Sequence, residues 1–68
     1  MMSTVQEVKD IIDRAAKMPW GPACSAELAR AVVLVDSLEG EEELRIEAYM
    51  ELATAYQQGN EEWKALAP

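Results

Sequence analysis

The chain has 68 residues, half of them hydrophobic, and thirteen acidic against six basic side chains give it a net charge of −7. This charge argues against nucleic-acid binding, because phosphate backbones are bound by lysine and arginine, and it also disfavours anionic membrane surfaces. The length allows one small domain, residues 1–68, which buries about 60% of the surface that its unfolded chain exposes. We therefore expect self-association or docking onto a larger protein to add stability.

The sequence carries no sign of a membrane or secretory protein. The longest apolar run, Ala31 to Val35, is far shorter than the ~20 residues that a membrane-spanning helix needs. The N-terminus lacks the basic and then apolar segments of a secretory signal. A single cysteine, Cys24, cannot form an internal disulfide, which fits a reducing compartment. We expect a cytoplasmic protein with no membrane partner.

Residue types that carry most enzyme chemistry are missing. Without histidine and with one cysteine, zinc sites, Ser–His–Asp triads and Cys–His pairs are excluded. The three glycines are too widely separated in the sequence to form a phosphate-binding loop. We therefore expect neither catalysis nor a metal or cofactor. Cys24 is interpreted as a small residue that packs beside Trp20.

A first helix is predicted to begin at Ser3 or Thr4, each of which has Gln or Glu three residues later, the spacing of a capping box. Its apolar residues recur at steps of three and four, namely Val5, Val8, Ile11, Ile12, Ala15 and Ala16. Opposite charges four residues apart, such as Lys9 and Asp13, occupy the other face. Pro19 is expected to end this helix. Trp20 is either an exposed recognition side chain or a cover over one end of the core, and we expect the latter.

A second helix is predicted from about Ala23 to Glu39, with Pro22 suited to its first turn and Gly40 to its end. Its main apolar stripe consists of Leu28, Val32, Val35 and Leu38. A second apolar face consists of Ala26, Ala29, Val33 and Leu34. A helix that is apolar nearly all round is usually buried on several sides. Either this helix is the central element of the fold, or its second face contacts another copy of the chain in a homo-oligomer, the arrangement we expect.

A third helix is predicted over Glu42 to Tyr56, where acidic residues suit the positive N-terminal end of the helix dipole. Its expected buried face is Leu44, Ala48, Tyr49, Leu52, Ala55 and Tyr56. Gly59 is expected to end it, and Asn60 to cap a short fourth helix that contains Trp63. The fold class predicted is all-α, with three main antiparallel helices and a short C-terminal one, because the connections are short.

Glu43, Glu47 and Glu51 follow one another at four-residue steps on the third helix, without basic residues between them at that spacing. Like charges in this arrangement destabilise a helix by a few tenths of a kcal/mol per pair, roughly. We call these three residues the acidic ridge. It is either a binding surface for a protein partner with a basic surface, or a solvated face that keeps an acidic protein soluble.

Residues 44–66 resemble part of a tetratricopeptide repeat, in which an aromatic residue, a leucine, a small residue and a tyrosine recur at fixed steps. The matching residues are Tyr49, Leu52, Ala53 and Tyr56. The chain departs from the family pattern because Ala53 replaces the usual glycine and the turn at Gly59 comes one residue early. The resemblance implies a protein-interaction scaffold, and a chain that is the N-terminal part of a longer helical-repeat protein.

These observations favour a non-catalytic protein–protein interaction module, an adaptor, docking or regulatory domain that self-associates. One alternative is a structural N-terminal cap of a longer helical-repeat protein. Another alternative is a binder of small molecules or peptides, lined by the aromatic residues Trp20, Tyr49, Tyr56 and Trp63.

Overall fold

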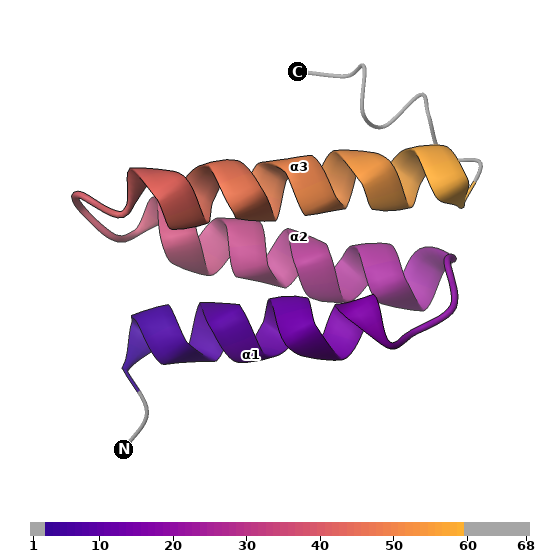
Figure 1. Ribbon diagram of the computed structural model, residues 1–68, viewed down its shortest axis with the longest axis horizontal. Coiled ribbons are helices and arrows are strands. Elements are labelled where there is room, and N and C mark those ends of the chain that lie inside the picture. Colours follow the sequence, from indigo (N-terminus) through magenta and orange to yellow (C-terminus); the bar gives the residue numbers. More distant parts are fainter. Residues whose placement is uncertain (1–2, 60–68) are drawn as a thin grey trace.

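The computed structural model describes residues 3–59, which form three α-helices and contain no strand. The helices are α1 (Thr4–Ala16), α2 (Pro22–Asp36) and α3 (Glu42–Gln58). They lie side by side, joined by short turns at alternating ends, with α2 between its two neighbours (Figure 1). The all-helical prediction is confirmed for this part of the chain, whereas the fourth helix predicted after Asn60 lies outside the described residues. Within residues 3–59, no helix has the length and apolarity needed to cross a bilayer.

The start of α1 is set by Ser3, whose side-chain hydroxyl accepts a hydrogen bond from the backbone N–H of Gln6 at 3.1 Å. This resolves the choice between Ser3 and Thr4. The ion pairs predicted along the outer face of α1 do not form among the described residues. Instead, Arg14 reaches α2, where its Nη2 lies 3.8 Å from Glu27 Oε2, and Gln6 donates a hydrogen bond to Asp10.

Helix α2 begins at Pro22 as expected, but it ends at Asp36, three residues before the predicted end. Ser37 is the C-cap, and its hydroxyl donates to the carbonyl of Leu34 at 2.6 Å. Gly40 follows with φ of +78°, in the left-handed region that favours glycine. Helix α2 therefore ends where the Ser37 hydroxyl can donate to one of its last carbonyls. Gly40 lies in the turn into α3 rather than at the end of the helix.

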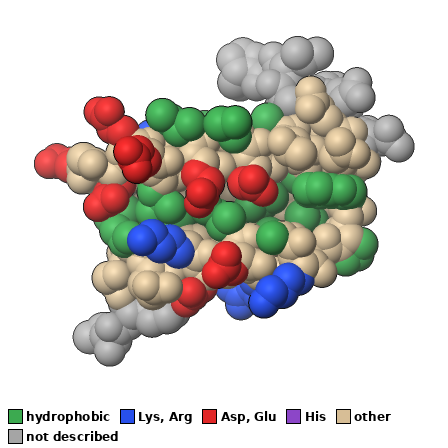
Figure 2. Space-filling view, in the orientation of Figure 1, with side chains coloured by type: hydrophobic (Ala, Val, Ile, Leu, Met, Phe, Trp, Pro, Cys, Tyr) green, Lys and Arg blue, Asp and Glu red, His purple; other side chains and the backbone are tan. Residues whose placement is uncertain are grey.

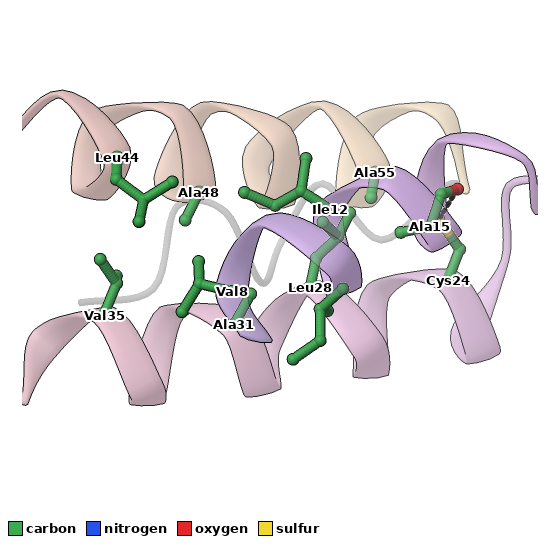
Figure 3. Packing of buried hydrophobic residues seen from close by; sticks show 11 residues of the cluster. Val8, Ile12, Ala15, Cys24, Leu28, Ala31, Val35, Leu44, Ala48 and Ala55 are labelled. Atoms are coloured by element: carbon green, nitrogen blue, oxygen red, sulfur yellow. Dashed lines mark hydrogen bonds between the residues drawn. The ribbon is translucent and has the colours of Figure 1, made fainter. Parts of the chain in front are cut away.

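The core is built on α2, which packs against both α1 and α3, while α1 and α3 touch each other less. Figure 3 shows the buried cluster: Val8, Ile11, Ile12, Ala15, Cys24, Leu28, Ala31, Val35, Leu44, Ala48 and Ala55. Four of these residues are alanines, all nearly or fully inaccessible to solvent. Alanine contributes little buried area but allows helices to approach closely. This core therefore buries little apolar area per residue, and its helices can pack close together.

Two aromatic residues expected in the core are half-exposed instead, Trp20 at 47% and Tyr49 at 46%. The expectation that Trp20 covers one end of the core is wrong. At that end the backbone of Gly59 lies close to the α1–α2 turn, since a Cβ at Gly59 would lie 3.5 Å from the Cα and N atoms of Gly21. Tyr49 lies at the border of α2 and α3 because its hydroxyl is bonded to α2, as described below.

Candidate interaction surfaces

The second apolar face of α2 is only partly covered by the other helices. Val33 is 69% exposed, Ala26 is exposed and Ala29 is half-buried. These three residues stand at steps of three and four and therefore form one stripe on the helix surface. We call Ala26, Ala29 and Val33 the α2 flank. Leu34, predicted to share this face, instead packs partly against the core, because it follows Val33 by about 100° around the helix.

The acidic ridge of α3 is divided by its surroundings. Glu43 and Glu47 are exposed and, together with Lys9 of α1, help to line a shallow hollow of about 230 Å³. Glu51 is half-buried and lies close enough to Cys24 for its charge to act on the thiol. Two of the three carboxylates are therefore accessible to a partner, and the third, Glu51, is partly buried.

Cys24 is a structural residue. It is fully buried, and its thiol donates a hydrogen bond to the backbone carbonyl of Ala15 at 3.5 Å. Burial raises the pKa of the Cys24 thiol, and the negative charge of Glu51 raises it further. Because the thiolate is the reactive form, a buried thiol with a raised pKa is poorly reactive. The burial of Cys24 is confirmed, but the neighbour that its hydrogen bond identifies is Ala15 of α1 rather than Trp20.

Helix α3 carries a second exposed apolar surface that the sequence analysis did not single out. Ile46 is 59% exposed and Met50 is 64% exposed. We call these two residues, one helical turn apart, the α3 outer stripe. In the space-filling view, hydrophobic side chains follow one edge of α3 with acidic side chains beside them (Figure 2). The signal was present in the sequence as two large apolar residues on the side opposite to Leu44 and Ala48.

Arg45 links the start of α3 to the end of α2. Its Nη2 donates to the carbonyl of Leu38 at 2.6 Å and to that of Val35 at 3.3 Å, and its Nε lies 3.4 Å from Asp36 Oδ1. The hydroxyl of Tyr49 donates to Asp36 Oδ2 at 2.6 Å. Asp36 therefore accepts from Tyr49 and pairs with Arg45. Arg45 also bonds the carbonyl of Leu38 and adds a second donor to the carbonyl of Val35, which already accepts from the backbone N–H of Leu38.

The hydrogen bond to Asp36 raises the pKa of Tyr49 above its ordinary value, with partial burial and the Asp36 charge adding to the effect and Arg45 opposing it. Only the protonated phenol can donate this bond. Its contribution to stability is therefore present below the ordinary tyrosine pKa of about 10 and is lost as the pH rises through the higher pKa of the folded state.

We expect Asp36→Asn to lower the pKa of Tyr49, because the substitution removes the negatively charged acceptor. Ultraviolet absorbance during an alkaline titration measures this shift, in a Tyr56→Phe background that leaves Tyr49 as the remaining tyrosine of the chain. Glu39→Gln, which removes an exposed carboxylate beyond the end of α2, is the control and should shift the titration less. An unchanged pKa in Asp36→Asn would contradict the assigned hydrogen bond.

The three described hollows do not bring the aromatic residues together. The described hollows are open and are lined mainly by charged side chains or by the α2–α3 turn, and Trp20, Tyr49 and Tyr56 line none of them. Trp63 lies outside the described residues. Among residues 3–59, no group of acidic or cysteine side chains is arranged to hold a metal ion. The surfaces that remain as candidates are the α2 flank, the acidic ridge and the α3 outer stripe.

Comparison of the chain with protein-family models, with curated proteins and with solved structures gave no match. The resemblance to a tetratricopeptide repeat therefore stays a prediction from the residues that carry it. The three surfaces have to be interpreted from their own chemistry.

Proposed function

We propose that this chain is a non-catalytic protein–protein interaction module that self-associates through the α2 flank and binds a basic partner at the accessible end of the acidic ridge. The observation that carries the proposal is Val33, which is 69% exposed although it belongs to the most apolar and most central helix. Leaving a valine side chain in water forgoes about 1.5–3 kcal/mol of burial free energy. Contact with a second copy recovers part of it.

The α2 flank suits contact between like molecules. Two of its three side chains are alanines, which allow two helices to approach closely. Arg30 and Asp36, one basic and one acidic, are both exposed and each lie three residues from Val33, so the flank is not bordered by carboxylates alone. A lone, buried thiol at Cys24 suits the reducing cytoplasm, where we place the protein.

A longer helical-repeat protein is the second candidate, and the exposed α3 outer stripe favours it. In a solenoid, each helical hairpin buries its apolar face against the next one. Ile46 and Met50 lie on the last described helix, where such a neighbour would stack. A natural chain that continues past Pro68 with further helical hairpins would support this candidate.

Self-association is tested by sedimentation velocity of the full chain over a range of concentrations. We expect a concentration-dependent oligomer that becomes a monomer in Val33→Asp, because the substitution places a charge in the contact between copies. Raising the salt concentration should strengthen association of the unmodified chain, since it screens the repulsion between molecules of charge −7.

Ile46→Asp makes the same change at an exposed position on α3 and is the matched control, expected to leave self-association unchanged. Circular dichroism confirms that both variants remain helical. A chain that is monomeric at every concentration, or a Val33→Asp variant that still associates, would overturn the proposed self-association.

A further inference from the structure

The α3 outer stripe lies on the opposite side of α3 from the core. Ile46 and Met50 each follow a buried residue, Leu44 and Ala48, by two positions, which places them about 200° around the helix axis from those residues. Ala53, one turn beyond Met50, is exposed as well. The stripe therefore presents two large side chains and a small one at helical spacing, so a partner can approach α3 closely at its far end.

Carboxylates border this stripe along the first half of α3. Ile46 has Glu42 and Glu43 one turn before it and Glu47 next to it, and Glu47 is also one turn before Met50. All three carboxylates are exposed. Arg45 is the only basic residue of α3, and it is engaged with Asp36 and the carbonyls at the end of α2. The acidic border of the stripe is thus not neutralised by its own helix.

The charge of the border distinguishes between possible occupants. Two copies of the chain that met through this stripe would bring two acidic borders together, with all three carboxylates facing their equivalents if the α3 helices were parallel and the two Glu47 side chains close together if they were antiparallel. Like charges placed together across an interface oppose association. A partner that carries lysine or arginine beside its apolar side chains gains favourable charge contacts at the same positions. The α2 flank and the α3 outer stripe therefore differ in the partner that they suit.

The geometry points to the α3 outer stripe as the docking site for an amphipathic, basic helix of another protein. The apolar side chains of that helix would contact Ile46 and Met50, and its lysine or arginine residues would face Glu43 and Glu47. Methionine adapts its shape to different apolar surfaces, which suits such a contact, and side-by-side helices with apolar residues one turn apart are a common mode of recognition. The inference rests on the proposed function, to which it adds the contact residues and the chemistry of the partner.

The test uses a synthetic, labelled helical peptide with leucines one turn apart and lysines beside them, and fluorescence anisotropy of its binding to the full chain. We expect this peptide to bind at least about tenfold more tightly than a peptide of the same composition whose leucines are scattered around the helix, a difference of about 1.4 kcal/mol. Met50→Ser should weaken binding by a similar factor. Glu43→Gln with Glu47→Gln should weaken it at low salt and less at high salt.

Val33→Ser is the matched control, since it removes an exposed apolar side chain from the α2 flank and should leave peptide binding unchanged. Equal binding of the ordered and scattered peptides would overturn the inference, because it would show attraction by net charge alone. Unchanged binding by Met50→Ser, or loss of self-association in that variant, would overturn it too. The latter result would identify the stripe as a contact between copies.

The two proposals can fail separately. A chain whose self-association is abolished by Val33→Asp but which does not distinguish the peptides would retain the proposed self-association and lose the α3 docking site. A chain that is monomeric at every concentration and binds the ordered peptide selectively would retain the docking site and lose the self-association.

Discussion

Replacing Leu28 by alanine is expected to lower the free energy of unfolding by about 2–5 kcal/mol, the range for removing a buried leucine side chain. Leu28 is 1% exposed and belongs to the central helix, where it is among the largest fully buried side chains. A domain of this size has a total stability of roughly 3–10 kcal/mol, at about 0.05–0.15 kcal/mol per residue. The substitution should therefore remove a large part of the stability or unfold the domain altogether.

Urea denaturation followed by circular dichroism measures the effect, at a protein concentration low enough to limit self-association. Val33→Ala also shortens an aliphatic side chain on α2, but at an exposed position, and should change the stability by no more than about 0.5 kcal/mol. Similar losses in the two variants would show that α2 is not packed as described.

Replacing Ala48 by leucine is expected to destabilise the fold by about 1–3 kcal/mol, because the larger side chain has to force closely packed helices apart. Ala48 is fully buried on the core side of α3. Ala53→Leu introduces the same side chain on the exposed side of the same helix and should be close to neutral. Because alanine and leucine both favour helices, the difference between the two variants isolates the effect of core space.

Thermal and urea unfolding of both variants measure this difference. An Ala48→Leu variant as stable as the unmodified chain would mean that the core has room for the added carbon atoms. The alanine-rich packing would then be loose rather than tight, and the small residues of the core would reflect empty space.

The helices and most of the core were predictable from local chemistry. The apolar spacing of Val8, Ile11 and Ala15 requires a helix, and their burial is confirmed. Ser3, Pro22 and Gly59 mark helix ends through backbone geometry and hydrogen bonds that involve only near neighbours in the chain. Such signals can be recognised in a sequence because they act over a few residues.

The candidate surfaces were predictable only in part. The α2 flank followed from an excess of apolar residues on one helix, which is a property of that helix alone. The buried side of α3 was predicted correctly at Leu44, Ala48 and Ala55, but the half-exposed position of Tyr49 and the second apolar stripe of Ile46 and Met50 were not predicted. Likewise, Glu51 is partly buried whereas Glu43 and Glu47 are exposed, and this difference comes from the neighbouring elements rather than from the sequence of α3 itself.

Local sequence alone established an acidic, all-helical molecule, the positions of its three described helices to within a few residues, and the lack of histidine-based chemistry. Tertiary packing decided that Tyr49 lies at the border of α2 and α3 rather than in the core, that α2 ends at Asp36, and that Trp20 is half-exposed. These outcomes depend on contacts such as Arg45 with the carbonyl of Leu38 and Gly59 beside Gly21, which join residues on different elements. The free energy of such a contact depends on a neighbour that the local pattern does not contain.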